Sequence, residues 1–363
     1  MITIVFLGYF IVALGLAATT TTLIRHLATK AEVLDRPTTG TPSRKIHHKP
    51  IPLMGGAAIF LTIAIITTIA LLLGHFNGIH IRGKFLIGLT LAGLILTFGG
   101  ALDDRYNLKP IYQLITPALA ILAIVASGIG IPYISNPLST GLIHLDTVSW
   151  TVVWWQGIPY KFTLFADVFA FLWIMGATYT TKVLDGLDGL VSGITVIGAL
   201  IVAAVSMMQD VAQPDTALLA IIISGSFAGF LIFNFNPASI FLGEGGSTLA
   251  GFLLGVLAII SGGKIATALL ILALPITDTA YTIFRRLKSK SGVANHDRLH
   301  LHHRLLDAGL SQRQVVLIYY FVAALFGTST LILEGPAKII AIAFAASLLP
   351  ILIYLTPRFV KKA

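Results

Sequence analysis

The chain has 363 residues, of which 56% are hydrophobic and only 11% are charged. Soluble domains usually contain about 25% charged residues, so this composition excludes an ordinary soluble protein. The formal net charge of +9 fits membrane topology and anionic ligands better than nucleic-acid binding, because no long polar stretch accompanies it. The sequence has no cysteine, which excludes disulfides and thiolate metal sites.

Apolar runs recur along the whole chain, and each is long enough to cross a hydrocarbon core of roughly 30 Å. We therefore predict an all-α polytopic membrane protein with a single domain over residues 1–363. The first run has no basic segment before it, which indicates a membrane helix and not a cleavable signal peptide. We expect eleven spans, at residues 2–24, 51–73, 85–102, 110–131, 166–183, 187–208, 215–234, 248–262, 265–283, 314–333 and 338–356.

The basic residues predict the orientation. One set of inter-span segments, with the C-terminal tail, holds 19 of the 24 Lys and Arg residues. Basic loops remain on the cytoplasmic side, so we expect the N-terminus outside and the C-terminus inside. The chain is thus predicted to be a multi-pass protein of the cytoplasmic membrane.

The main outer loop is predicted at residues 132–165. From Leu142 onward its apolar residues alternate with others, which predicts a short β-hairpin at the membrane interface. Its aromatic residues Trp150, Trp154, Trp155 and Tyr160 are expected to anchor the loop in the interfacial belt.

Two carboxylates, Asp185 and Asp188, stand between two long apolar stretches, and a glycine follows each of them. A charge at the centre of a membrane helix costs roughly 2.5–3.5 kcal/mol, so the pair marks a helix end in water or a functional polar site. Capping of the following helix is the simple alternative. Asp103 and Asp104 likewise suit either an exposed span end or catalysis.

Two further segments have two interpretations each. The glycine-rich run from Phe241 to Ser247 is either a plain turn with Ser247 as the N-cap, or an anion site at a helix start. The run from His300 to Arg304 is either a solvated loop or a phosphate-binding group. All these polar segments fall on the predicted cytoplasmic face, which favours a site for a phosphorylated ligand.

In this order, the motifs resemble those of the polyprenyl-phosphate N-acetylhexosamine-1-phosphate transferases, of the MraY/WecA/TagO type. The likeness extends from about Arg36 to Gln314, and the last motif is closest to the WecA/TagO branch. The matching segments are Arg44-Lys45-Ile46-His47 to Gly56, Leu102-Asp103-Asp104, Leu184 to Leu190, Asn234 to Ser247, and Asp297 to Leu306.

The resemblance implies that a lipid phosphate, usually undecaprenyl phosphate, attacks the β-phosphate of a UDP-N-acetylhexosamine and releases UMP. It implies Mg²⁺ as cofactor, N-acetylglucosamine as the expected sugar, and a possible homodimer. By motif position, Asp103 and Asp104 would orient or deprotonate the lipid phosphate, and Asp185 and Asp188 would line the nucleotide site. The other implied contacts are Gly186, Leu187, Asn234 and Phe241 with uracil, Lys45, His47 and Lys49 beside the donor, and His300, His302, His303 and Arg304 with the diphosphate or sugar.

Three positions depart from this pattern. Lys182 and Glu244 stand where the family usually has the Asn and Asp associated with Mg²⁺, and Gln113 is near where a lysine often follows the acidic pair. A protonated lysine cannot bind a metal, so Lys182 is interpreted as a cation that pairs with Glu244 and neutralises the diphosphate. Lys109 is a candidate to replace the missing lysine.

Three outcomes are open for the metal question: a metal-independent transferase, a shifted Mg²⁺ on Glu244 and another carboxylate, or an inactive relative. Two other classes of protein are also open. A transporter would have broken helices and charges at mid-membrane. A non-catalytic scaffold would bind lipid phosphate or UDP-sugar without releasing UMP.

Overall fold

The computed structural model describes residues 2–37, 49–76, 78, 81–135, 141–155, 158–209, 211–262, 264–288, 300–333, 335 and 337–348. The elements, in chain order, are α1 (Ile2–Lys30), β1 (Leu34–Asp35), β2 (Ile51–Pro52), α2 (Gly55–Leu72), α3 (Gly83–Tyr106), α4 (Pro110–Ala126), β3 (Tyr133–Ser135), β4 (Leu142–His144), β5 (Ser149–Trp155), β6 (Ile158–Thr163), α5 (Leu164–Leu184), α6 (Leu190–Ser206), α7 (Pro214–Asn234), α8 (Gly243–Ile260), α9 (Ile265–Ile271), α10 (Ala273–Lys288), α11 (Leu301–Asp307) and α12 (Gln312–Ser329).

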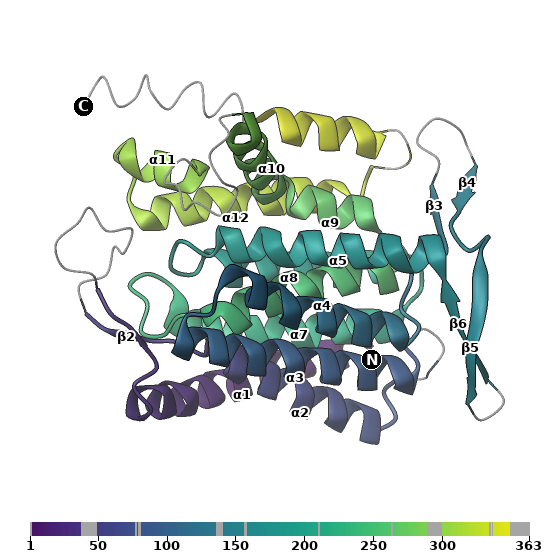
Figure 1. Cartoon of the computed structure of the whole chain (residues 1–363), viewed down its shortest axis with the longest axis horizontal. Helices are drawn as coiled ribbons and strands as arrows, with labels where there is room; N and C mark the ends of the chain where they lie inside the picture. Colours follow the sequence, from purple (N-terminus) through teal and green to yellow (C-terminus); the bar gives the residue numbers. More distant parts are fainter. Residues whose placement is uncertain are drawn as a thin grey trace.

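The long helices run side by side, with the β-hairpins at one end of the bundle and β2 and α11 at the other (Figure 1). Helix α8 lies at the centre, because it packs against α2, α3, α5, α6 and α7. In its most apolar stretch 83% of residues are buried, against 17% in α1. Large apolar side chains of α1, such as Ile4 and Leu7, are therefore exposed on the outside of the bundle, as expected for a surface in contact with lipid.

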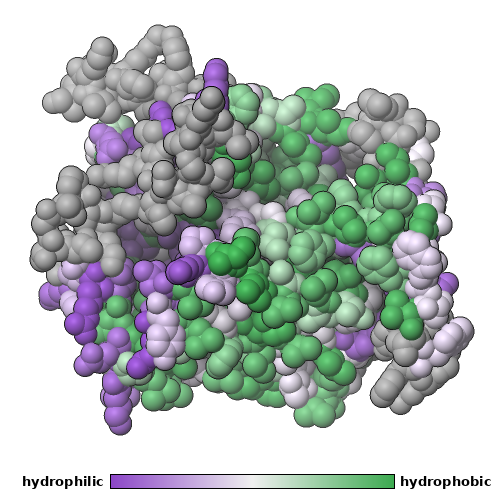
Figure 2. Space-filling view, in the orientation of Figure 1, coloured by the Kyte–Doolittle hydropathy of each residue, from purple (hydrophilic) through white to green (hydrophobic). Residues whose placement is uncertain are grey.

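The structure confirms the prediction of a mostly helical membrane protein with several spans. Among the described residues, six helices are long and apolar enough to cross a membrane, and a bent pair adds a seventh. Shorter apolar helices occupy residues 110–126, 190–206 and 337–348. Figure 2 shows the apolar side chains across the middle of the molecule and hydrophilic ones gathered at the end near β2 and α11.

Several predicted spans differ from the helices of the structure by a few residues, and two differences matter for the site. The span expected at residues 265–283 is two helices, α9 and α10, which meet at an angle of 78°. The span expected at 248–262 begins five residues earlier, at Gly243, because the glycine-rich run is already helical. This second difference changes the interpretation of the site, since it places Glu244 in the first turn of α8.

The predicted hairpin is present and has a companion. Strands β5 and β6 pair antiparallel, and so do β3 and β4. Trp150 of β5 stacks on Phe162 of β6 with ring centroids 6.1 Å apart. Trp150 and Trp154 are 54% and 66% exposed, which suits the expected role of interfacial anchors.

Candidate active site

One cavity of about 890 Å³ lies where several elements end. It is formed near the C-terminal ends of α3, α5 and α7, the N-terminal ends of α6 and α8, and the strand β2. These ends meet because consecutive helices alternate in direction, and all of them face away from the β-hairpins (Figure 1). The cavity is therefore at one end of the bundle.

Most of the site residues predicted from sequence line this cavity. They are Lys49, Asp104, Lys182, Asp185, Gly186, Leu187, Asp188, Asn234, Phe241, Glu244 and His303. Asp103, His300, His302 and Arg304 are nearby in the same elements but are not among the lining residues. Lys45 and His47 lie outside the described residues.

The two adjacent acids of α3 have different surroundings. Asp104 lines the cavity, and its Oδ1 accepts a hydrogen bond from the backbone N–H of Glu244 at 2.9 Å. Asp103 is buried behind it, and its Oδ1 accepts from the N–H of Leu108 at 2.7 Å and from Nε2 of Gln113 at 3.2 Å. Asp104 is thus the member of the pair that a ligand in the cavity can reach.

Close packing of glycines brings Asp104 to α8. A Cβ atom on Gly100 of α3 would collide with the backbone of Gly245, and one on Gly56 of α2 would collide with Gly246. Gly243 has a backbone φ of +70°, a conformation that residues other than glycine rarely adopt. The glycine-rich run therefore serves helix packing and the sharp entry into α8.

The interpretation of Ser247 as an N-cap is wrong. Helix α8 begins at Gly243, and Ser247 lies inside it, buried, with Oγ donating to the carbonyl of Glu244 at 3.3 Å. The alternative is an anion site at the start of a helix, and an acidic side chain does accept a hydrogen bond from the first turn of α8. The anion at the first turn is the carboxylate of Asp104 from the protein itself.

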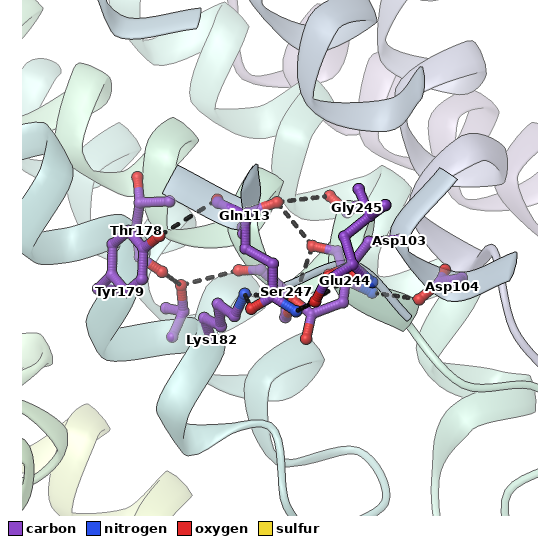
Figure 3. Close-up of polar contacts among 12 residues, drawn as sticks. Asp103, Asp104, Gln113, Thr178, Tyr179, Lys182, Glu244, Gly245 and Ser247 are labelled. Atoms are coloured by element: carbon purple, nitrogen blue, oxygen red, sulfur yellow. Dashed lines mark hydrogen bonds and ion pairs between the residues drawn. The ribbon is translucent and has the colours of Figure 1, made fainter. Parts of the chain in front are cut away.

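The three residues that depart from the family pattern are connected to one another (Figure 3). Nζ of Lys182 donates to Oε1 of Gln113 at 2.8 Å and lies 2.9 Å from Oε2 of Glu244. Because Gln113 also donates to Asp103, a continuous polar network joins α3, α4, α5 and α8. Lys109, the other candidate for the missing lysine, is exposed and does not line the cavity.

The residues implied as Mg²⁺ ligands do not fit that ion. Mg²⁺ requires oxygen ligands in an octahedral arrangement at about 2.0–2.1 Å, and Lys182 offers only N–H donors. The ammonium occupies the position next to Glu244 that a metal would need. Within the described parts of the chain, no three His, Asp or Glu side chains converge in a manner suited to a metal.

Asp185 and Asp188 do not cap the following helix. The N-cap of α6 is Gly189, and no side chain caps it. Asp188 instead accepts hydrogen bonds from Nδ2 of Asn236 at 2.9 Å and from the N–H of Ala238 at 3.1 Å, so it fixes the turn after α7. The capping alternative is therefore wrong for both aspartates.

Asp185 is an exposed residue that lines the cavity. Desolvation by the protein around the cavity raises the pKa of Asp185 above its ordinary value, and the negative charges of Glu244, Asp104 and Asp188 raise it further. Five acidic residues thus line one cavity, namely Asp35, Asp104, Asp185, Asp188 and Glu244, together with Lys49 and Lys182.

Asn234 and Phe241, the residues expected to contact uracil, both line the cavity, but the amide of Asn234 is already used within the protein. Its Nδ2 donates to the carbonyl of Ile240 at 3.0 Å, and its Oδ1 accepts from Ser192 at 2.7 Å. Phe241 is half-buried, and its backbone pairs with Pro52 of β2 and with Gly55. These bonds fold the segment between α7 and α8 over the cavity.

The histidine motif forms the short helix α11 and not a solvated loop. His300, His302 and His303 are all buried, and the ring of His302 packs over Gly186. Asp278 of α10 accepts a hydrogen bond from Nδ1 of His300 at 3.1 Å and another from the N–H of Leu301 at 3.0 Å. This buried pair attaches α11 to the bundle and places His303 at the cavity.

Sequence reasoning did not identify the positioning roles of Gln113, Asn236 and Asp278. Each is a single polar residue whose partner is far away in sequence, so no local spacing identifies it. Asp278 stands out only as an acid inside a predicted span, and Gln113 only as a departure from the family pattern.

Comparison with known proteins gives a consistent picture. Residues 86–262 match the model of Glycosyl transferase family 4. A probable undecaprenyl-phosphate N-acetylglucosaminyl 1-phosphate transferase of Bacillus subtilis is 31% identical over 90% of this chain and 84% of its own. A decaprenyl-phosphate N-acetylglucosaminephosphotransferase of Mycobacterium leprae is 28% identical over 90% and 83%. The undecaprenyl-phosphate alpha-N-acetylglucosaminyl 1-phosphate transferase of Escherichia coli K12 is 26% identical over 85% and 79%.

Proposed function

Because this chain belongs to Glycosyl transferase family 4, we propose that it transfers N-acetylglucosamine 1-phosphate from UDP-N-acetylglucosamine to a polyprenyl phosphate such as undecaprenyl phosphate. The observation that supports this most strongly is the cavity, which gathers Asp104, Asp185, Glu244 and Lys182 at the end of a bundle of apolar helices. A lipid phosphate in the membrane and a nucleotide in water meet at such a position.

In the proposed reaction an oxygen of the lipid phosphate attacks the β-phosphorus of the donor. A new P–O bond forms, the bond from that phosphorus to the bridging oxygen breaks, and UMP leaves with that oxygen. Phosphoryl transfer depends mainly on positioning and on neutralising charge. Asp104 is the candidate that orients or deprotonates the lipid phosphate, because it faces the cavity and is held by the first turn of α8.

We further propose that the cavity faces the cytoplasm, with the N-terminus outside, the C-terminus inside and eleven crossings. The support is the concentration of Lys and Arg in one set of inter-span segments, of which the described parts 25–37 and 103–109 lie at the cavity end. The product, a polyprenyl-diphosphate sugar, would be the first membrane-bound intermediate of a cell-envelope glycan.

The direct test is an assay with purified protein, undecaprenyl phosphate and a panel of UDP-sugars. We expect release of UMP and formation of a lipid-diphosphate sugar with UDP-N-acetylglucosamine. Binding of donor or lipid without UMP release would support the scaffold alternative. Solute uptake by proteoliposomes without any transfer would support a transporter.

A pair of variants tests the assignment of the acids. Asp104→Asn should lower kcat by about 10²–10⁴-fold, as the loss of a positioned acid–base group does, while UDP affinity changes little. Asp103→Asn should cost much less, because an asparagine oxygen still accepts from Leu108 and Gln113. Equal losses in both variants would contradict the different roles given to the two acids.

A further inference from the structure

The ammonium of Lys182 is held at a defined place in the cavity wall. Gln113 and Glu244 bind it at 2.8 and 2.9 Å, and the side chain is only 15% exposed. Gln113 is itself fixed by its bond to Asp103, and Tyr179 lies beside the ammonium with its ring centroid 5.7 Å away. A lysine held from three sides is positioned more firmly than a lysine on a surface.

The negative charge of the cavity gives the Lys182 ammonium a function. Five acidic side chains line the cavity, and a diphosphate would bring further negative charge into it. Like charges repel strongly at short range in a protein cavity, so a diphosphate needs cations in this cavity in order to bind. Lys182 supplies such a cation in addition to Lys49 of the same lining, and Gln113 accepts from one of the three N–H donors of its ammonium.

The same position excludes a metal from Oε2 of Glu244, the oxygen that pairs with the ammonium. A Mg²⁺ bound to this carboxylate would lie within about 2.1 Å of its oxygen, directly against an ammonium that is 2.9 Å from Oε2. Two cations cannot share that place without strong repulsion, and Lys182 is confined there by Gln113.

We propose that Lys182 is the built-in counter-cation for the diphosphate of the nucleotide, so that nucleoside diphosphate binding does not depend on Mg²⁺. This inference rests on the proposed function, since it concerns the donor side of the same cavity. Gln113 is then a positioning residue, which acts through Lys182.

The test measures binding of UDP by the purified full-length protein, in EDTA and in excess Mg²⁺. Wild-type affinity should change by less than about twofold between the two conditions. Lys182→Asn should lose on the order of tenfold or more in EDTA, the scale expected for one charge-assisted hydrogen bond. Part of this loss should return with Mg²⁺, because the variant frees Glu244 and adds an amide oxygen.

Lys84→Asn is the matched control, since Lys84 is at the opposite end of α3, roughly 28 Å along the helix from Asp103. It should bind UDP as the wild type does in both conditions. A wild-type protein whose UDP affinity rises tenfold or more with Mg²⁺ would overturn the inference, even if Lys182→Asn did not fold. A protein that binds UDP in neither condition would refute the nucleotide site itself, and the proposed function with it.

Discussion

At the scale of the residue, Asp185 combines a raised pKa with a position at the cavity. Its carboxyl group is desolvated and faces Glu244, Asp104 and Asp188, with Lys182 in the same cavity. When a carboxyl pKa is higher in the folded than in the unfolded protein, ionisation lowers the stability of the fold. The stabilising effect of the neutral form is present at low pH and is lost as the pH rises through the folded-state pKa.

Asp185→Asn should therefore raise the melting temperature more at pH 8 than at pH 5, by an amount on the order of a few degrees, and at the same time impair transfer. Thermal unfolding in one detergent at both pH values measures this difference. Asp146→Asn, in the exposed hairpin region, serves as the control and should show no such rise. A larger effect at pH 5 would contradict the raised pKa.

Residue-level prediction from sequence named several residues that the structure brings to one cavity, where one motif supplies them, and their roles stay predictions. The segment Leu184–Leu190 and the glycine-rich run both reach the cavity, and Lys182 pairs with Glu244 as interpreted. It failed to find the route by which Gln113 connects Asp103 to Lys182, because that route depends on how α4 packs between α3 and α5. Packing of this kind leaves no periodic pattern in the sequence.

At the scale of the element, the glycines of α2, α3 and α8 determine how closely the helices of the site approach one another. Gly100 touches the backbone of Gly245 so closely that a methyl group has no room. This contact sets the distance from Asp104 to the first turn of α8. The sequence shows the glycines but not their partners, so their role as a helix contact emerges only from the structure.

Gly100→Ala should destabilise the protein, by about 1–3 kcal/mol as overpacking usually does, and should reduce transfer because it displaces Asp104. Gly176→Ala on α5 is the control, since a Cβ there meets no atom within 4 Å. That control should leave stability unchanged or raise it by about 0.5–1 kcal/mol. Thermal unfolding compares the two variants, and equal destabilisation by both would contradict a specific Gly100–Gly245 contact.

The break between α9 and α10 shows the limit of span prediction. Both pieces are apolar, so composition predicts one continuous helix over 265–283, whereas the structure bends by 78° between them. The bend lets α10 present Asp278 to His300 of α11. A long-range pair determines the geometry here, and apolar periodicity contains no information about it.

At the scale of the whole molecule, the polar cavity and the β-hairpins mark opposite ends of the bundle (Figure 1). The proposed orientation places the cavity end in the cytoplasm. The chain has no cysteine, so single cysteines introduced at exposed positions report the side directly. Ala31, beside β1, marks the cavity end, and Thr147, next to β5, marks the hairpin end.

In intact cells a membrane-impermeant maleimide should label Thr147→Cys and not Ala31→Cys. Ala31→Cys should react when inverted vesicles are used. The cysteine-free parent gives the background. Labelling of Ala31→Cys in intact cells would reverse the proposed orientation.

The network of Gln113, Lys182 and Glu244 also has a consequence for how this sequence changed over time. Replacement of Lys182 by an uncharged residue would leave Glu244 without its cation, and replacement of Glu244 would leave an ammonium without its carboxylate. Each single exchange passes through a poorly neutralised intermediate, so the three positions are expected to evolve as a unit. Relatives with lysine at position 182 should then also have glutamate at 244 and an uncharged hydrogen-bonding residue at 113, a correlation that ancestral reconstruction can examine step by step.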